Sequence, residues 1–334
     1  MSTDTRLLTQ RDIVRLLDLA SCIDAVERAF RLHGEGRTVK PGVLGTHVDG
    51  GGFHVKTAGL AGDRAYYAAK VNANFPDNPR ARGLPSIQGV VLLYDASSGA
   101  PLAIMDSIEI TRLRTAAASA VAAKHLSRPD SRVMTIIGCG AQASSHVRAL
   151  AAVRRIERVL AFDAAQGRAD SFARTMRSTF GIDVTPVDDY RRAVRESDIV
   201  VTCTPARAPI LHSRDLPPGV FVAAVGADSE DKQELDVHAL AESVVVADIV
   251  EQCAAIGELH HALEAGEMTL MDVRADLGAV VSRTRPGRTS PAERVIFDST
   301  GTALQDVAAA ALAYERACDR GVGTRITLAD QEVR

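Results

Sequence analysis

The apolar positions in the first third of the chain predict helices followed by antiparallel strands. Residues 10–33 carry apolar side chains at helical spacing with a break near Ser21, which predicts two short helices. Residues 43–56 and 64–75 have the composition of strands separated by the loop AGLAGD. Residues 86–107 predict a β-hairpin that turns at Ser-Ser-Gly. The N-terminal part is therefore expected to be antiparallel β-structure preceded by helices.

The pattern changes at an alanine-rich helix predicted over residues 109–127, which Pro129 ends. From residue 132 onward, short runs rich in Val and Ile alternate with helical stretches and lack the alternation of a half-exposed strand. Such runs are typical of parallel strands that helices cover on both faces. Residues 294–321 predict a last strand, a glycine turn and a long helix. We therefore expect an α/β chain with a doubly wound parallel sheet.

A glycine-rich turn joins the first parallel strand to the helix after it. The stretch GCGAQA at 138–143 has the GxGxxA spacing of dinucleotide-binding turns: a tight turn, a bare backbone for a diphosphate and a small residue for helix packing. The next strand-like run ends at Asp163, an acid placed to bind the adenosine ribose hydroxyls. The turn thus predicts a Rossmann-type domain that binds NAD. Because Arg168 lies a few residues further on, NADP remains the less favoured cofactor. The alternative to a dinucleotide site is a turn that only packs, with Asp163 capping a helix.

The composition favours a small-molecule partner over nucleic acid or a membrane. The 334 residues include 46% apolar residues, enough for a large core, and the net charge of -3 gives no basic footprint. No run of about 18 apolar residues of the membrane-spanning kind occurs, and the first residues lack the pattern of a signal peptide. Five scattered cysteines without a CxxC pair favour a reducing, cytoplasmic location.

Charged side chains at strand ends and among small residues are candidates for a second ligand. Asp228 follows an apolar strand and is placed to face a substrate, with a helix N-cap for DSEDKQELD as an equal alternative. Lys56, Lys70 and Arg114 stand among apolar or small neighbours, where a cation needs either an internal ion pair or a bound anion. No HxH or HxxxH pair and no GxSxG occurs, so neither a metal site nor a hydrolase nucleophile is expected.

Several stretches, in order along the chain, resemble the ornithine cyclodeaminase/mu-crystallin family. They include KVNANFPDN, LRTAAASA, IIGCGAQA, VGADSEDKQELD and IFDSTGTALQD. The family contains ornithine and lysine cyclodeaminases, archaeal alanine dehydrogenases and imine or ketimine reductases. The resemblance implies a Rossmann NAD-binding domain over residues 116–304. It also implies an α+β substrate-binding and dimerisation domain, formed by residues 1–115 with 305–334, in a homodimer.

The resemblance also implies roles for single residues. Lys70 and Arg114 are expected to bind the substrate carboxylate, and Asp228 to move protons at the substrate nitrogen. Lys56 and Thr300 are the further expected substrate contacts. The cofactor is expected to contact Ser86, Arg114, Thr115, Gly138, Gly140, Ala141, Gln142, Asp163, Thr204, Val225, Gly226, Lys232 and Ser299.

Two departures from the family pattern bear on the substrate. Gly42 stands where the family often has a carboxylate-binding arginine, for which Lys56 is the expected substitute, and His54 stands near a glutamate of the ornithine enzymes. We expect NAD-dependent hydride transfer at the α-carbon of an amino acid, giving an imine. A cyclodeaminase, which closes a ring with loss of ammonia and reduces the cyclic imine, is the leading prediction. The alternatives are an alanine dehydrogenase or imino-acid reductase and, of another class, a non-catalytic NAD(P)H-binding protein.

Overall fold

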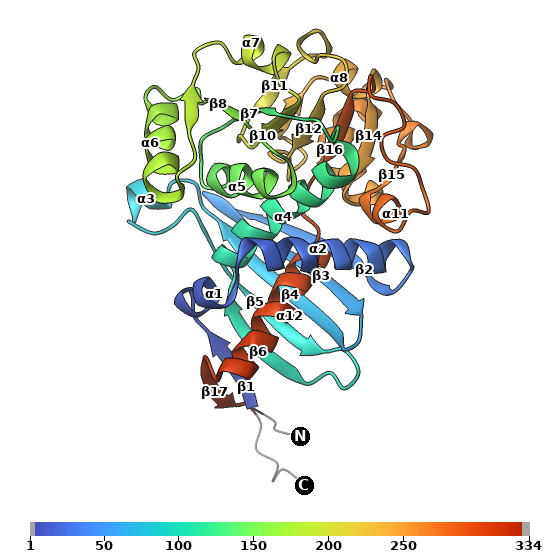
Figure 1. The fold of residues 1–334 in the computed structure, drawn as a ribbon. Helices are drawn as coiled ribbons and strands as arrows, with labels where there is room; N and C mark the ends of the chain where they lie inside the picture. Colours follow the sequence, from blue (N-terminus) through green and yellow to red (C-terminus); the bar gives the residue numbers. More distant parts are fainter. Residues whose placement is uncertain (1–3, 329–334) are drawn as a thin grey trace. The chain divides into compact units, whose positions relative to one another are not determined.

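The computed structural model describes residues 4–328, which fall into two compact units (Figure 1). One unit comprises the chain up to Arg114 together with the chain from Thr302 onward, and the other comprises Thr115–Gly301. No helix among the described residues combines the length and the apolar character needed to cross a bilayer.

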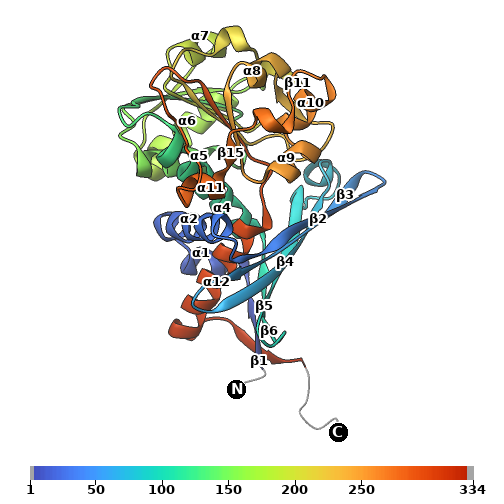
Figure 2. The same ribbon diagram turned by 90° about the vertical axis from the view of Figure 1, so that its right-hand side faces the viewer.

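The first unit is built on a seven-stranded sheet in the order β17-β1-β6-β5-β4-β3-β2. Helix α12 packs against β3 and β4, and α2 packs against α12, so both helices lie on one side of this sheet (Figure 2). The helices are α1 (Gln10–Leu16), α2 (Leu19–Gly34), α3 (Asn78–Ala81) and α12 (Ala303–Arg320). The strands are β1 (Asp4–Leu8), β2 (Thr38–Val48), β3 (Gly51–Ala61), β4 (Ala65–Asn74), β5 (Ile87–Asp95), β6 (Pro101–Asp106) and β17 (Thr324–Thr327).

Two details of the expected N-terminal part are wrong. The break between the first helices lies at 17–18, not near Ser21, because the Asp18 side chain accepts the backbone N–H of Ser21 and so caps α2. Residues 43–56 are not one strand, because the chain reverses at Asp49-Gly50, where Gly50 has a φ of 76°. The expected loop AGLAGD therefore largely belongs to β3. The predicted hairpin over 86–107 is confirmed as β5 and β6.

The second unit contains an eight-stranded, wholly parallel sheet in the order β9-β8-β7-β10-β12-β16-β14-β15. Its strands are β7 (Val133–Ile137), β8 (Arg158–Phe162), β9 (Val184–Pro186), β10 (Ile199–Thr202), β12 (Phe221–Ala224), β14 (Val244–Ala247), β15 (Ala275–Asp276) and β16 (Val295–Asp298). Every residue of β10, β12 and β16 is buried, as expected for strands covered on both faces. The predicted Rossmann-type fold class is confirmed.

Short helices connect these strands, and helix α4 (Ile108–Leu126), where the expected alanine-rich helix lies, precedes them. The others are α5 (Ala143–Val153), α6 (Arg168–Phe180), α7 (Tyr190–Arg195), α8 (Val237–Ala241), α9 (Val250–Ile256), α10 (Glu258–Glu264) and α11 (Leu277–Val281), with 3-10 turns at Ser213–Asp215 and Leu270–Asp272. A small parallel pair, β11 (Arg207–Leu211) and β13 (Gln233–Leu235), completes the unit. The strand order reverses between β7 and β10, which is the position where sheets of this type bind ligands.

Candidate functional site

The glycine turn follows β7 at this point of reversal. Gly138 has a φ of 97°, and a Cβ there would lie 2.8 Å from the carbonyl oxygen of Cys203, so only glycine fits. At Gly140 an added Cβ would meet no atom within 4 Å, which leaves the backbone open. Ala143 is buried at the start of α5, and the N-cap residue Gln142 makes no side-chain capping bond. Open backbone beside an uncapped helix start fits a dinucleotide diphosphate.

Asp163 lies directly beside the glycine turn. Its Oδ2 accepts a hydrogen bond from the backbone N–H of Cys139 at 2.8 Å, and its Oδ1 accepts one from that of Ala165 at 2.8 Å. The alternative that Asp163 caps the next helix is wrong, because Gly167 is the N-cap of α6. The Arg168 guanidinium lies 3.7 Å from Oδ1. The acid is therefore held where a ribose beside the turn would meet it.

Other expected ligand contacts follow strands of the same sheet. They are Thr204 after β10, Val225 and Gly226 after β12, and Ser299 and Thr300 after β16. Because the strands are parallel, these ends share one edge of the sheet with the glycine turn. The Thr300 hydroxyl is buried and donates to Oδ1 of Asp248 at 3.1 Å, while Gln252 donates to it at 2.7 Å. Its side chain is thus occupied by internal hydrogen bonds.

Asp228 lies in the segment that follows β12. The alternative of a helix N-cap is wrong here, because the segment forms turns and the short strand β13 instead of a helix. The Asp228 side chain is 51% exposed and forms an ion pair with Lys232. The Nε2 atom of His261 lies 2.8 Å from the carbonyl oxygen of Lys232 and so contacts the same segment. The side chain is therefore accessible from solvent at the segment after β12.

Three cations that the sequence singled out come together in the first unit. Lys56 and Lys70 are cross-strand partners on β3 and β4. The Lys70 Nζ lies 2.8 Å from Oδ2 of Asp306, and the Arg114 Nε lies 2.8 Å from Oδ1 of the same carboxylate. Nη1 of Arg114 also donates to Oε1 of Gln305 at 2.7 Å. All of these side chains are buried, so we call Lys56, Lys70, Arg114 and Asp306 the cation cluster.

The buried charges of the cation cluster shift the pKa values of Lys70 and Asp306. The pKa of Lys70 is lowered to about 7, first by burial and then by the charge of Arg114, against the opposing effect of Asp306. Burial alone would raise the pKa of Asp306, but the charges of Arg114 and Lys70 outweigh burial and lower it. The expected alternative of internal ion pairs therefore holds for Lys70 and Arg114, which share one carboxylate. Two buried cations on one acid fit the binding of a second carboxylate.

Sequence reasoning did not single out several of these partners. Asp306 and Gln305 belong to α12, where their signal was a pair of polar residues in an alanine-rich helix. Glu234 and Asp248, which accept hydrogen bonds at the strand ends, were also missed. The remaining expected residues lie elsewhere: Ser86 is half-buried and accepts the N–H of Phe75 through its carbonyl, and Thr115 is buried in α4.

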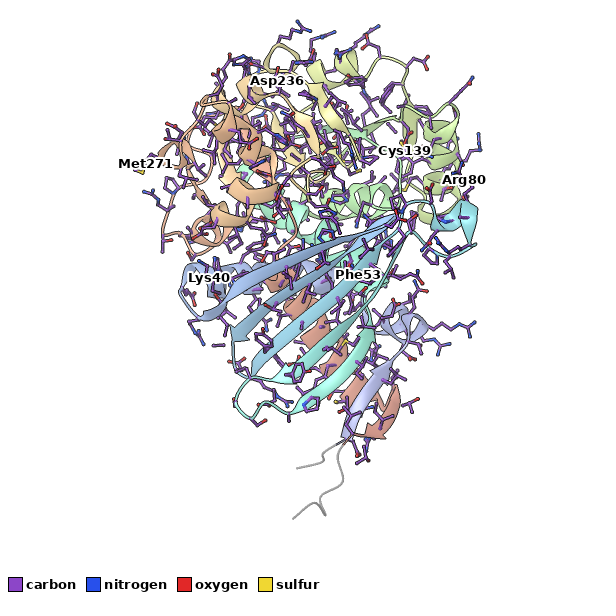
Figure 3. The ribbon with its side chains drawn as sticks, turned by 180° about the vertical axis from the view of Figure 1, so that it is seen from behind. Lys40, Phe53, Arg80, Cys139, Asp236 and Met271 are labelled. Carbon is purple, nitrogen blue, oxygen red and sulfur yellow. The ribbon has the colours of Figure 1, made fainter. Side chains whose placement is uncertain are left out.

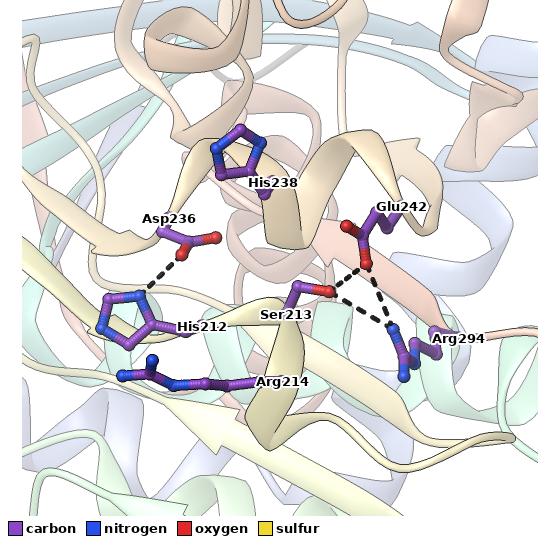
Figure 4. A pocket seen from close by; sticks show the side chains of 7 residues that line it. All are labelled: His212, Ser213, Arg214, Asp236, His238, Glu242 and Arg294. Carbon is purple, nitrogen blue, oxygen red and sulfur yellow. Dashed lines mark hydrogen bonds and ion pairs between the residues drawn. The ribbon is translucent and has the colours of Figure 1, made fainter.

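The Thr115–Gly301 unit has a surface pocket that contains a His–Asp pair (Figure 4). Nδ1 of His212 lies 2.6 Å from Oδ2 of Asp236, but the Ser213 hydroxyl donates to Glu242 and not to the histidine. Glu242 and Arg294 stand just before β14 and β16, at the amino ends of parallel strands. The pocket therefore lies at the opposite edge of the sheet from the glycine turn.

The fold and the glycine turn define a dinucleotide-binding protein with a Rossmann domain. The model of the ornithine cyclodeaminase/mu-crystallin family matches residues 3–321, and the chain belongs to this family. An alanine dehydrogenase of Archaeoglobus fulgidus is 36% identical over 324 residues, which are 97% of this chain and 98% of that protein. The resemblance found in the sequence is thus confirmed.

Solved structures of relatives agree over nearly the whole chain. An archaeal alanine dehydrogenase dimer with bound NAD has a TM-score of 0.92 at 36% identity, covering 98% of this chain and 100% of that one. The Delta(1)-pyrroline-2-carboxylate reductase of Thermococcus litoralis, in complex with NADH and L-proline, also has a TM-score of 0.92, at 34% identity, covering 96% and 100%. The relatives named here are enzymes of amino-acid or imino-acid chemistry.

Proposed function

We propose that this protein is an NAD-dependent enzyme that exchanges a hydride at the nitrogen-bearing α-carbon of an amino or imino acid. The observation that carries the proposal is the cation cluster, in which buried Lys70 and Arg114 share the carboxylate of Asp306 beside buried Lys56, an arrangement that fits a substrate carboxylate. The glycine turn, with its open backbone at Gly140, supports NAD as the cofactor. The relatives crystallised with NAD or NADH support the same assignment.

The chain's own residues would divide the work between binding and proton transfer. Lys70 and Arg114 hold the carboxylate, with Lys56 beside them, and this grip orients the α-carbon. Bound NAD supplies a hydride acceptor, and NADH a donor, at the nicotinamide ring. Asp228 takes a proton from the substrate nitrogen when the amine is oxidised and returns it when the imine is reduced.

The dehydrogenase or imine-reductase outcome is the one we favour over cyclisation. A cyclodeaminase must also bind a second, terminal amine, and the acid expected near residue 54 for ornithine is replaced by His54. The acid of the cation cluster does not serve to bind that amine, because the carboxylate of Asp306 is already paired with Lys70 and Arg114. Cyclisation stays the second proposal, because the family includes cyclodeaminases by name.

One panel of substrates tests the proposal and separates these outcomes. The protein is incubated with NAD and L-alanine, L-proline, L-ornithine or L-lysine, and in reverse with NADH and pyruvate plus ammonia or the cyclic imino acids. Net NADH formation, or NADH consumption in reverse, identifies a dehydrogenase or reductase. Ammonia release without net NADH identifies a cyclodeaminase. Binding of NADH without turnover of any member of the panel contradicts an enzymatic role and leaves the non-catalytic NAD(P)H-binding alternative.

Affinity for a carboxylate ligand should fall as the pH rises above 7. Lys70 has a pKa lowered to about 7, so its charged form is lost above that value, and binding of an anion must restore the proton. We expect the dissociation constant of pyruvate, measured with NADH present, to rise by up to about tenfold per pH unit between pH 8 and 10. Pyruvate carries no amine that titrates in this range. In Lys70→Arg, which does not titrate, a slope as steep as that of the parent would contradict the assignment.

The first unit leaves one face of its sheet uncovered, and we propose that a second copy of the chain covers it. Leu44, Val55, Val71 and Val90 are consecutive cross-strand partners in one row over four strands, on the face opposite Lys56 and Lys70; we call this row with Phe53 the open face. Leu44 is 63% exposed, Phe53 40% and Val90 39%. Figures 2 and 3 show no helix over the open face from the part of this unit that the structure describes.

The substitution Val71→Asp should convert the dimer into a folded monomer. A carboxylate at the centre of the open face would lose its water on association, whereas in the separate chain it stays hydrated. Val14→Asp is the matched control, since Val14 is an exposed aliphatic residue of α1. Light scattering coupled to size exclusion should give one chain for Val71→Asp and two for the control. An unchanged mass for Val71→Asp would show that the copies associate elsewhere.

A further inference from the structure

The buried carboxylate of Glu234 joins the two ends of the segment that carries Asp228. Glu234 lies on β13, and its Oε1 accepts hydrogen bonds from both the backbone N–H and the hydroxyl of Thr204, each at 2.7 Å. Its Oε2 accepts the backbone N–H of Gly226 at 2.8 Å. Residues 226 and 234 are thereby joined, so the intervening residues, with Asp228 and Lys232 among them, form a closed loop. We call residues 226–234 the Asp228 loop.

The same contacts join the ends of two parallel strands. Thr204 follows β10 and Gly226 follows β12, so the Glu234 carboxylate lies between these two strand ends. A Cβ on Gly226 would lie 2.4 Å from Cδ of Glu234, which shows how closely the carboxylate packs on that backbone. A carboxylate suits this place because it is acceptor-only, and the groups that face it here are donors.

Two further buried carboxylates, those of Glu258 and Asp298, hold the backbone at and beyond Glu234 through hydrogen bonds. Glu258 accepts the backbone N–H groups of Glu234 and Leu235 at 2.8 and 3.0 Å. Asp298, at the end of β16, in turn accepts those of Glu258 and Leu259 at 3.2 and 2.9 Å. Burying several carboxylates is costly, and such groups add less to stability than apolar side chains of similar volume. Their arrangement is better accounted for by the positions they impose on the backbone.

We infer that Glu234 is a positioning residue, which holds the Asp228 loop so that Asp228 exchanges protons with the substrate nitrogen. The inference rests on the proposed function, in which Asp228 is the proton-transfer group. Geometry is the reason for the expected effect, since a displacement of about 1 Å can cost about 10²-fold in rate. The glycine turn, Gly138 to Ala143, follows a different strand, so cofactor binding through the diphosphate should survive the loss of Glu234.

The substitution Glu234→Gln tests the inference, because it keeps the size of the side chain but turns one acceptor into a donor. We expect kcat, measured with saturating cofactor, to fall by about 10- to 100-fold, with the KM for the substrate changed by less than about threefold. Amide hydrogen exchange over the Asp228 loop, measured on the full chain with NADH, should be at least about fivefold faster. Unchanged kcat together with unchanged exchange would overturn the inference.

A matched control separates positioning from a general loss of stability. Asp198 also accepts two backbone N–H groups, those of Arg132 and Val133 at 2.7 and 2.9 Å, but it precedes β10 at the other edge of the sheet. Asp198→Asn should lower the melting temperature and leave kcat within about threefold. An equal loss of kcat in both variants would reduce Glu234 to a structural residue. If Glu234→Gln fails to fold, Thr204→Val, which removes one of the three hydrogen bonds, should still lower kcat by about three- to tenfold with saturating cofactor, and an unchanged kcat would overturn the inference.

A double variant distinguishes failure of this inference from failure of the proposed function. If Glu234 acts through Asp228, then Asp228→Asn combined with Glu234→Gln should be no slower than Asp228→Asn alone. Additive losses would show that Glu234 acts on another step and would overturn the inference. If Asp228→Asn alone keeps its activity, the proposed role of Asp228 fails and the inference fails with it. The amide hydrogen-exchange rates of Glu234→Gln would then show only that the Glu234 carboxylate holds the Asp228 loop closed.

Discussion

The substitution Arg114→Lys should lower kcat/KM for the amino-acid or imino-acid substrate by about 10²- to 10³-fold. Arg114 is buried, with Nε against Asp306 and Nη1 against Gln305, which fixes the plane of its guanidinium. The group has five N–H donors, more than these two contacts use, and can bind a carboxylate through two parallel hydrogen bonds. Lysine keeps the positive charge opposite Asp306 but cannot form these two parallel hydrogen bonds.

Arg112→Lys is the matched control for this prediction. Arg112 lies on the same helix, α4, and pairs with Glu109, so the same change there should leave kcat/KM within about threefold. The affinity for NADH, followed by fluorescence titration, decides the role of Arg114. If Arg114 chiefly contacts the cofactor, as its family position also implies, NADH affinity falls as far as kcat/KM. A normal kcat/KM in Arg114→Lys would show that Arg114 does not bind the substrate carboxylate.

The substitution Asp228→Asn should lower kcat by about 10²- to 10⁴-fold, the usual contribution of a positioned acid or base. Asparagine has the same shape as aspartate, so it can still contact Lys232, but its amide takes up no proton at neutral pH. The loss should appear in both directions of the reaction, because the amine loses a proton in one and the imine gains it in the other. The affinity for NADH should change by less than about threefold, since the glycine turn is untouched.

Asp231→Asn provides the matched control within the same loop. Asp231 pairs with Arg207 at 2.9 Å and accepts a hydrogen bond from Ser229, so it is a neighbouring carboxylate with its own surface partners. Its substitution should leave kcat within about threefold. Steady-state kinetics of both variants at several pH values complete the test. Loss of the pH dependence of kcat only in Asp228→Asn supports a proton role, and near-parental rates in Asp228→Asn would refute it.

The sequence was most informative where structure is local. The spacing of Gly138, Gly140 and Ala143 predicted a strand, a turn and a helix because each position has one steric requirement, and the structure meets all three. Runs of Val and Ile without alternation predicted parallel strands, since only a strand covered on both faces tolerates them. The expectation failed at Asp49-Gly50, a dipeptide typical of two-residue hairpin turns, which interrupts the run of strand-forming residues there.

The candidate site depends on contacts that no local pattern contains. The sequence singled out Lys56, Lys70 and Arg114 as cations in need of a partner, but it did not reveal that Asp306, more than 190 residues from Arg114, would be that partner. It also left open whether Asp228 caps a helix. Both answers depend on which strands become neighbours, and strand pairing over long separations is decided by packing of the whole sheet.

By itself, the sequence determined that this protein has a doubly wound sheet with a dinucleotide turn and belongs to a family of amino-acid and imino-acid enzymes. Those features depend on steric needs and on periodicity, which a single segment carries. Only the tertiary structure decided that Lys70 and Arg114 converge on one acid, and that Glu234 closes the Asp228 loop. The physical reason is that the free energy of a buried charge depends on every neighbour that folding brings to it, whatever the distance along the chain.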